Sequence, residues 1–395
     1  MISVAQAQEQ ILSRAATLNL VAVALEKAAG RILGRNACAD ADSPPFDASA
    51  MDGFACRRAD LPGPLAIAGA SRPGRPFAGR PAARECVSIL TGAPVPEELD
   101  CVIKQEDTAR EGDAVRVLRH DDRSFVRHRG ENRRAGEVVV PAGTRLAAPE
   151  LAALAGIGIV RPEVVRAARC VHIVTGDELV APESAPGIGA IRDSNSILVA
   201  TLIASARAEL VQQSRCGDDD GIIGDEVRSA PDHDVLLLSG GAGPGDRDPA
   251  RAVLSALGYE IVSDGVNLRP GKPLIHATRG RQHAFALPGN PVSHWVVFQL
   301  FVAPLLRTLQ GCREPRPVLV RGRIGGSVNL PPPDPRPTYW PCHSRPVGGE
   351  HELSLLPIAS SGDALGLVGA NALLPLPAPP AILQAGQPIE FIPCA

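Results

Sequence analysis

The sequence predicts an α/β protein of several subdomains, in which a domain of alternating strands and helices is joined to two β-rich regions. Between residues 168 and 312, buried apolar strands alternate with helices, a pattern typical of a parallel sheet. Between 61 and 145, short apolar runs are separated by Gly and Pro, which indicates a β-rich region. From about residue 313, the stretch NLPPPDPRPTYWP belongs to a third region of short strands and turns.

Composition excludes several classes of protein. Hydrophobic residues make up 45% of the 395 residues and charged residues 21%, as in globular proteins. The net charge of −3 does not fit a nucleic-acid binder, which usually has a basic excess. The N-terminus lacks the cationic start and apolar run of a secretory signal, and no apolar stretch is a convincing membrane span. Nine cysteines without a CxxC pair favour a reducing, cytoplasmic compartment.

Local patterns predict the elements of the N-terminal half in order. Residues 4–18 form an amphipathic pattern, and residues 21–30 predict a second helix that ends at Gly30. Paired prolines within SPPFDASAMDGFA break the helical pattern. The runs VSIL, CVIK, AVRVL and EVVVPAGTRL predict strands, and residues 148–158 predict a short helix.

The α/β region follows from continuous apolar runs. Strands are predicted at CVHIV, DVLLLS, PLIHAT and HAFALP. A helix over 194–209 is expected to be capped by Ser194 or Asn195, and another begins at Pro249. A long apolar helix over 290–309 has Asn290 as its cap and Pro291 at its first position.

The turn SGGAGPGDRDP, residues 239–249, joins a strand to a helix through glycines, an arrangement that suits phosphate binding. It lacks the lysine of a P-loop and carries Asp246 and Asp248 instead. A divalent cation would reconcile these carboxylates with phosphate, since Mg²⁺ takes one or two carboxylates plus phosphate oxygens. Alternatively, Asp248 is a helix N-cap before Pro249 and Asp246 a plain turn residue.

Other turns carry charges that suit a binding site. Asp177 and Glu178 follow a buried strand, at the sheet edge where open α/β folds bind ligands, although a surface turn explains them as well. Arg269 and Lys272 flank a rigid turn that suits an oxyanion, or is simply exposed. LPGNPVS, residues 287–293, places helix-terminal N–H groups beside a glycine turn, which a capped helix start also explains.

The motifs taken in order carry a resemblance to a known family. The set is PFDASAMDGFA, TGAPVP, DCVIKQE, TGDEL, DSN, SGGAGPGDRD, RPGKP, LPGNPVS and SSGD. It resembles the molybdopterin molybdenumtransferases of the MoeA type, which include the E domains of gephyrin and its plant counterpart. The resemblance covers residues 3 to 393, and although several motifs are common singly, their ordered set is highly specific.

The resemblance implies a fold and an activity. The expected fold has a doubly wound, MogA-like α/β domain at 168–312, a β-rich subdomain at 40–136 and a C-terminal β-barrel at 313–395. An elongated linker subdomain comprises 1–39 and 137–167. The expected reaction inserts molybdenum from molybdate into adenylylated molybdopterin, with Mg²⁺, and releases AMP. The implied protein is a cytoplasmic, elongated homodimer in which residues of one subunit are supplied across the dimer cleft.

The resemblance also assigns residues to roles. Asp52 and Thr91 come from the β-rich subdomain across the dimer cleft and are catalytic, together with Glu178 and Asp248. Metal ligands are Glu178, Asp246 and Asp248. The implied binding residues for pterin, pyrophosphate and molybdate are Asp177, Ser194, Asn195, Ser239, Gly240, Gly241, Arg269, Lys272, Pro288, Gly289, Asn290, Pro291, Ser293, Arg336 and Ser361.

Some positions depart from the family pattern and keep alternatives open. Ala242-Gly243-Pro244 replaces Val-Ser-Val, Asn132 replaces an aspartate, and Gly265 lies where a lysine is frequent. One alternative is a non-catalytic relative that binds the finished cofactor or scaffolds a molybdoenzyme. Another is a molybdopterin adenylyltransferase, which uses a similar α/β domain. Expected partners are that adenylyltransferase and molybdoenzymes or their chaperones, with no nucleic acid and no membrane.

Overall fold

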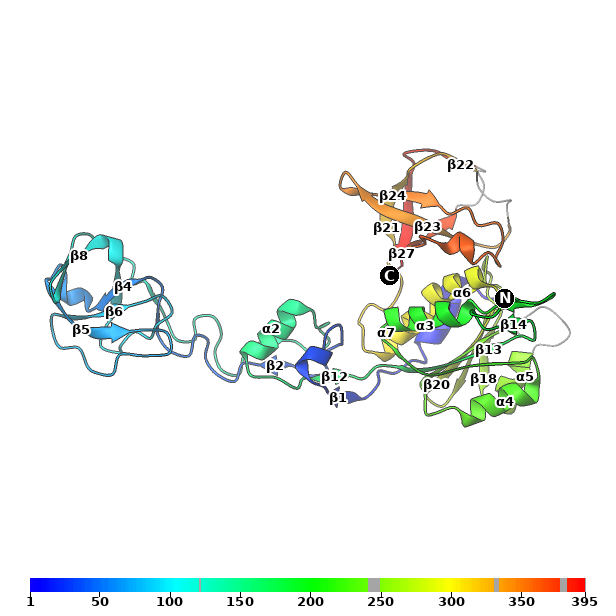
Figure 1. Cartoon of the computed structure of the whole chain (residues 1–395), viewed down its shortest axis with the longest axis horizontal. Coiled ribbons are helices and arrows are strands. Elements are labelled where there is room, and N and C mark those ends of the chain that lie inside the picture. The colour runs from blue at the N-terminus through cyan, green and yellow to red at the C-terminus, as the bar shows by residue number, and fades with distance from the viewer. Residues whose placement is uncertain (121, 241–248, 330–333, 377–381, 395) are drawn as a thin grey trace. The chain divides into compact units, whose positions relative to one another are not determined.

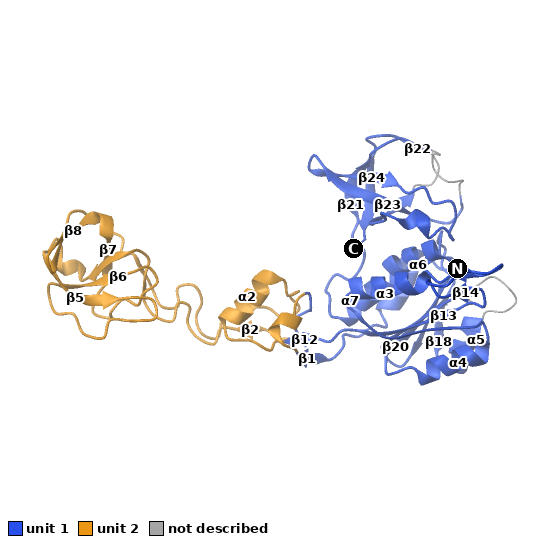
Figure 2. Ribbon diagram, in the orientation of Figure 1, with its two compact units in different colours: residues 1–22, 30–34, 163–395 blue, residues 23–29, 35–162 orange. Residues whose placement is uncertain are grey.

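A computed structural model describes residues 1–120, 122–240, 249–329, 334–376 and 382–394. The chain divides into two compact units (Figure 2). Unit 1 comprises residues 1–22, 30–34 and 163–395, and unit 2 comprises residues 23–29 and 35–162. The Gly241, Asp246 and Asp248 of the glycine-rich turn lie outside the described residues.

Unit 1 contains a six-stranded sheet in the order β16-β13-β17-β20-β19-β18 (Figure 1). Its strands are β13 (Arg169–Thr175), β16 (Glu209–Cys216), β17 (Val235–Ser239), β18 (Glu260–Asp264), β19 (Ile275–Arg279) and β20 (Gln282–Leu287). The first four strands in this order are parallel, as predicted, but β19 and β18 are antiparallel. The prediction of a parallel sheet was therefore wrong at this edge, because two residues join β19 to β20 and so short a connection makes a hairpin.

Helices cover both faces of this sheet, so the domain is doubly wound as predicted. The helices are α3 (Asn195–Ser205), α4 (Asp220–Ser229), α5 (Pro249–Ala256), α6 (Pro291–Val297) and α7 (Ala303–Leu309). Alternate residues of each strand enter different cores: Val235 and Leu237 pack with α3, α6 and α7, whereas Leu236 and Leu238 pack with α4 and α5. This alternation is the period of two expected of a strand that is buried on both sides.

The predicted helix over 290–309 is one apolar rod made of α6, a π-helical segment (Phe298–Val302) and α7. Among the described residues, the span Pro291–Leu309 is long and apolar enough to cross a membrane, but 89% of it is buried inside the structure. It therefore packs as the core helix of a soluble domain. Asn290 is its N-terminal flanking residue and Pro291 its first residue, as predicted.

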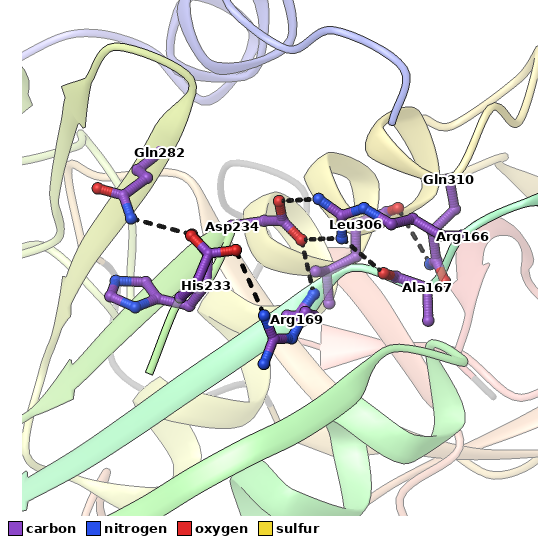
Figure 3. Close-up of polar contacts among 9 residues, drawn as sticks. Arg166, Ala167, Arg169, His233, Asp234, Gln282, Leu306 and Gln310 are labelled. Carbon is purple, nitrogen blue, oxygen red and sulfur yellow. Dashed lines mark hydrogen bonds and ion pairs between the residues drawn. The ribbon is translucent and has the colours of Figure 1, made fainter. Parts of the chain in front are cut away.

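A cluster of polar side chains joins the N-terminal ends of β13 and β17 (Figure 3). Arg166 donates two hydrogen bonds to the Asp234 carboxylate, at 2.6 and 2.7 Å. The backbone N–H of Arg169 donates to the same carboxylate, at 2.8 Å. Gln282, at the start of β20, donates to the carbonyl of His233 at 3.0 Å. These contacts fix the N-terminal edge of three adjacent strands.

The remainder of unit 1 includes a closed five-stranded barrel, as the resemblance implied. Its strands are β21 (Val320–Ile324), β23 (Thr338–Val347), β24 (Glu350–Leu355), β25 (Ala372–Leu376) and β27 (Pro388–Pro393). A separate ribbon pairs β22 (Val328–Asn329) with β26 (Ile382–Leu383). Short strands β14 (Leu179–Val180) and β15 (Ile191–Arg192) pair beside the α/β sheet. Buried Phe391, Leu353 and Leu374 fill the barrel core.

The N-terminal helix and the predicted second helix differ from expectation. Helix α1 (Val4–Leu12) has a capping box formed by Ser3 and Gln6 but ends six residues before the predicted end. The helix predicted over 21–30 was wrong. Its start belongs to β1 (Leu20–Ala22), which pairs with β12 (Glu163–Val165), and a single 3₁₀ turn follows at Leu25–Lys27. Pairing with a distant strand thus overrides local helix propensity.

Unit 2 contains the predicted β-rich region as a six-stranded sheet in the order β7-β4-β6-β5-β9-β8. The strands are β4 (Gly53–Cys56), β5 (Leu65–Ser71), β6 (Glu85–Ile89), β7 (Cys101–Lys104), β8 (Thr108–Glu111) and β9 (Ala114–Val117). Two ribbons pair β3 (Ala48–Ser49) with β10 (Val126–Arg127) and β2 (Ala37–Cys38) with β11 (Val138–Val140). Helix α2 (Ala148–Gly156) has Pro149 in its first turn, close to the prediction.

Candidate active site

The order of the strands directs attention to one edge of the α/β sheet. From β13 the chain moves to β16 on one side and then to β17 on the other, so the winding direction reverses between β13 and β17. Ligands of open α/β folds bind at such a reversal, outside the carboxyl ends of the strands. Here those ends are Thr175 and Gly176 after β13, and Ser239 and Gly240 after β17.

A cavity of about 970 Å³ lies at this edge, and we call it the strand-end cavity. Its lining includes Thr175, Glu178, Asn195, Gly240 and Asn290 from the α/β domain, together with residues 362–365 of the C-terminal region. Gly240 is required by close packing, because its φ is +102° and a Cβ atom would lie 2.3 Å from the carbonyl oxygen of Thr175. The turn after β17 therefore approaches the end of β13 more closely than any side chain allows.

Two polar atoms in the strand-end cavity are buried without a protein partner. Within the described residues, the Thr175 Oγ1 and Asn195 Oδ1 atoms accept or donate no hydrogen bond. The Thr175 and Asn195 side chains are nearly inaccessible, and the Asn195 amide nitrogen already donates to the Gly289 carbonyl at 2.7 Å. A buried polar atom without a partner costs free energy, so both atoms suit a polar ligand in the cavity.

The acidic side chains at this edge of the sheet differ in their contacts. Glu178 and Asp218 line the strand-end cavity. Asp193 accepts from the Ser196 N–H at 2.9 Å and so caps α3. Ser194 flanks the N-terminus of α3, as predicted, but its side chain makes no capping hydrogen bond, and Asn195 is the first helical residue and donates to the Gly289 carbonyl. The Asp177 carboxylate, outside the cavity lining, accepts from the Asp218 N–H at 3.3 Å.

The described carboxylates fit a hard divalent cation that is shared with a phosphate. No group of three or more His, Cys, Asp or Glu side chains in the described ranges could hold a metal alone. Mg²⁺ does not need such a group, because it is usually bound by one or two carboxylates together with water and phosphate oxygens. Glu178 and Asp218 provide two carboxylates at the edge of the strand-end cavity.

A second cavity of about 960 Å³ lies between the α/β domain and the barrel, and we call it the basic cavity. Its lining includes most of the predicted oxyanion and pterin residues: Arg269, Lys272, Pro288, Gly289, Asn290, Ser293, Arg336 and Ser361. Pro291 lines the strand-end cavity instead. The two cavities share Gly289 and Asn290, and the Asn290 amide donates to the Ser361 hydroxyl at 2.7 Å.

Asp334 orients the cations of the basic cavity. Arg336 donates from Nε and Nη2 to the two oxygens of Asp334, at 2.8 and 2.7 Å, and Arg269 Nη1 lies 3.8 Å from Asp334 Oδ2. The hydrogen bonds from Arg336 hold the pKa of Asp334 well below its usual range. The two guanidinium groups, with Lys272, leave a net positive cluster that suits an oxyanion.

Unit 2 brings Asp52 and Thr91 together. The N–H and hydroxyl groups of Thr91 both donate to Asp52 Oδ1, at 2.7 and 2.8 Å. The backbone hydrogen bond and then the hydroxyl lower the pKa of Asp52, so this exposed carboxylate stays ionised. Asn132, which departs from the family pattern, accepts a hydrogen bond from Arg127 at 2.8 Å.

Sequence reasoning missed several residues of the site. Thr175, Asp193 and Asp218 line the strand-end cavity, and Asp334 organises the basic cavity. Asp218 follows β16, a strand the sequence did not reveal because ELVQQSRC has neither a continuous apolar run nor a regular alternation of apolar and polar residues. Had that strand been recognised, the acidic turn after it would have pointed to Asp218 as a third acidic strand end.

Comparison with known proteins identifies first the class and then the family. Residues 2–158 match the family model described as the MoeA N-terminal region (domain I and II). Residues 172–308 match the model described as a probable molybdopterin binding domain. The doubly wound domain thus matches a class described as probable molybdopterin binding domains, and the residues before it match the N-terminal region of MoeA.

Relatives that cover most of the chain define the family. A molybdopterin molybdenumtransferase of Nostoc sp. is 33% identical over 391 residues, which cover 93% of this chain and 87% of the relative. One from Haemophilus influenzae is 32% identical over 73% of each chain. The crystal structure of the molybdopterin biosynthesis moeA protein from Pyrococcus horikoshii covers the whole chain with a TM-score of 0.82 and 25% identity. The chain belongs to the MoeA family of molybdopterin molybdenumtransferases.

Proposed function

We propose that this chain transfers molybdenum from molybdate to adenylylated molybdopterin, with release of AMP. Membership of the family makes the chain an enzyme that inserts molybdenum into molybdopterin during cofactor biosynthesis. The finer proposal rests on one observation, the pair of adjoining cavities that share Gly289 and Asn290. One cavity offers carboxylates and buried polar atoms, and the other offers three cations, so together they suit a pterin pyrophosphate beside an oxyanion.

In this proposal the strand-end cavity holds the pyrophosphate and the adenylate. The Thr175 hydroxyl would donate to a phosphate oxygen, and Asn195 Oδ1 would accept from a hydroxyl or amino group of the adenylate. Glu178 and Asp218 would hold Mg²⁺ at the edge of this cavity, and the resemblance adds Asp246 and Asp248 as ligands. When bound, the cation would polarise the phosphoryl oxygens. Glu178 orients the water that hydrolyses the adenylate.

The basic cavity is proposed to hold molybdate. Arg269, Lys272 and Arg336 neutralise the dianion, and the Ser361 hydroxyl, fixed by Asn290, donates to one of its oxygens. Because both cavities meet at residues 289–290, a pterin that lies along this turn would present its sulfur atoms to the oxyanion while its phosphate stays in the strand-end cavity. Hydrolysis and metal insertion would then occur on one bound substrate.

A direct assay tests the activity and the role of Glu178. Purified protein is incubated with adenylylated molybdopterin and molybdate, with MgCl₂ or with a chelator, and AMP release is measured. Glu178→Gln should lower the rate by about a hundredfold or more, since the amide cannot serve as an anionic ligand. Asp225→Asn is the matched control, because Asp225 is an exposed carboxylate on α4 outside both cavities. Full activity of Glu178→Gln would remove Glu178 from the mechanism.

We also propose a homodimer in which Asp52 and Thr91 of one subunit complete the site of the other. The proposal rests on the family resemblance and on the paired, ionised carboxylate of Asp52. Mixing Asp52→Asn subunits with Glu178→Gln subunits tests it. If each site takes one residue from each chain, random mixing restores about a quarter of wild-type activity, since one site of every heterodimer is intact. If the site is formed within one chain, mixing restores none.

The cellular role is proposed from the same chemistry. The substrate must come from an adenylyltransferase that acts on molybdopterin, and the product must pass to molybdoenzymes or their chaperones in the cytoplasm. The competing proposal, a non-catalytic cofactor-binding relative, draws on the departures at Asn132 and Gly265. Complementation of a strain that lacks the insertase separates the two. A folded, expressed protein that fails to restore molybdoenzyme activity would support the non-catalytic relative.

A further inference from the structure

Three polar side chains lie buried beneath the turns that form the two cavities. The Ser239 hydroxyl at the end of β17 is 2.7 Å from His172 Nε2 of β13 and 2.7 Å from His294 Nε2 of α6. All three residues are at most 1% exposed. Neither histidine lines a cavity, so neither would touch a substrate.

The outer partners of these groups determine the direction of each hydrogen bond. The Gln213 amide nitrogen of β16 contacts His172 Nδ1 at 2.8 Å and the Ser196 carbonyl at 3.0 Å. An amide nitrogen only donates, so His172 Nδ1 accepts and the proton of this ring is on Nε2. His172 therefore donates to the Ser239 oxygen.

The same argument applies at the other end. His294 Nδ1 lies 3.1 Å from the carbonyl oxygen of Asn290, which only accepts, so this ring carries its proton on Nδ1. His294 Nε2 is then an acceptor, and the Ser239 hydroxyl donates to it. The result is a chain in one direction from Gln213 through His172, Ser239 and His294 to Asn290, in which every polar hydrogen has an acceptor.

The hydrogen-bond chain can form only if both imidazole rings are neutral. A second proton on His172 would face the Gln213 amide hydrogens, and a second proton on His294 would face the Ser239 hydroxyl hydrogen. Burial lowers the pKa of His172 to about 3 and the pKa of His294 to about 4, so both rings are neutral at physiological pH.

The hydrogen-bond chain passes through the two turns on which the proposed substrate would lie. Ser239 directly precedes Gly240, the tightly packed residue of the strand-end cavity. Asn290 belongs to the turn shared by both cavities, and its side chain holds Ser361. Fixing Ser239 to Asn290 through His294 therefore fixes the two turns relative to each other and to β13.

We propose that His172 and His294 are positioning residues that hold the turns after β17 and β20 in the geometry required by the substrate. The inference rests on the proposed function for its catalytic consequence, but the hydrogen-bond chain itself does not depend on it. Errors of about 1 Å in the placement of a reacting group can reduce rates a hundredfold. A chain of fully satisfied, buried hydrogen bonds suppresses such errors.

The hydrogen-bond chain can be tested without an activity assay. Nitrogen-15 NMR of the imidazole rings should show His172 with its proton on Nε2 and His294 with its proton on Nδ1. Both rings should remain neutral from about pH 8 to about pH 5, below the usual histidine pKa. The opposite tautomer at either ring, or protonation near pH 6.5, would overturn the proposed chain whether or not the protein is an insertase.

Kinetics test the positioning role. His294→Phe keeps a buried ring but removes the acceptor, and kcat/KM should fall about tenfold or more. His294→Gln offers an amide oxygen to Ser239 and should recover most of the loss. His276→Phe is the matched control, since His276 of β19 is another fully buried histidine of the α/β domain and lies outside both cavities. The kcat/KM of this variant should stay within about twofold of the wild-type value. Equal kinetics of His294→Phe and His276→Phe would overturn the positioning role.

A double-variant cycle tests whether His294 acts through Ser239. If it does, Ser239→Ala with His294→Phe should be no slower than the slower single variant, because both changes break the same link. Independent, multiplicative losses would contradict a shared chain. An inactive wild-type protein would instead refute the proposed function, and the NMR result would still decide the hydrogen-bond chain.

Discussion

At the scale of single residues, the basic cavity depends on geometry as much as on charge. Arg336 presents two parallel N–H groups to Asp334, and that pairing fixes the guanidinium plane beside Arg269. A lysine could supply the charge but only as a point, without the rigid fork. The orientation of Arg336, rather than its charge alone, should therefore set the affinity for the oxyanion.

Arg336→Lys tests this expectation. The KM for molybdate should rise about fivefold to tenfold while kcat changes little, because the lost contact acts on ground-state binding. The measurement is the rate of cofactor formation as molybdate is varied. Arg321→Lys is the control, since Arg321 lies on barrel strand β21 and outside the basic cavity. A fall in kcat at unchanged KM would assign Arg336 to the chemical step instead.

The sequence predicted single site residues only where they belong to a local motif, because spacing along the chain does not show which distant residues are in contact. Arg269, Lys272, Asn290 and Ser361 lie in one cavity, as the motifs implied. The link from Gln213 to Asn290 crosses four elements of the fold, and no spacing along the chain reveals it. Thr175 was likewise unpredictable, because its importance lies in a buried hydroxyl without a protein partner.

At the scale of secondary-structure elements, strands with continuous apolar runs were predictable and those with mixed faces were not. β17 reads VLLLS and is buried throughout, whereas β16 reads ELVQQSRC, lies at the edge of the sheet and was missed. The helix wrongly predicted over 21–30 has the opposite cause, since its residues favour a helix locally but the first two of them, Val21 and Ala22, pair with β12. Sequence-distant pairing is the information that the local pattern lacks.

The Asp234 cluster makes an element-scale prediction about stability. Asp234→Ala should lower the free energy of unfolding by about 2–3 kcal/mol, because Arg166 and the Arg169 N–H would both lose their acceptor in a largely buried position (Figure 3). Urea denaturation measures the change.

Arg228→Ala is the control for that experiment, since it breaks the Arg228–Asp225 ion pair on α4, in which both side chains are mostly exposed. Its cost should be about 0.5 kcal/mol or less. Equal costs for Asp234→Ala and Arg228→Ala would show that the cluster does not hold the strand starts together.

At the scale of the whole molecule, buried histidines make unit 1 sensitive to acid. Burial lowers the pKa of four histidines in the α/β sheet and α6: His172 and His276 to about 3, and His283 and His294 to about 4. In the unfolded chain each has a pKa near 6.5. As pH falls below 6.5 the unfolded chain takes up protons that the folded protein refuses, so the equilibrium shifts toward unfolding.

The stability contributed by these neutral histidines is therefore complete above about pH 6.5 and is lost progressively down to about pH 3, where His172 and His276 are also protonated in the folded protein. At pH 5.5 each histidine should cost about 1 kcal/mol relative to neutral pH. Urea unfolding at several pH values should show this decline. In His276→Phe the free energy of unfolding should fall less steeply with pH, because one fewer histidine takes up a proton on unfolding. A free energy of unfolding that stays constant between pH 7 and pH 5 would mean that these histidines are not held neutral. The hydrogen-bond chain through His172 and His294 requires neutral rings, so it would then lose its physical basis. The same neutral histidines therefore govern both the stability of unit 1 at low pH and the positioning of the proposed site.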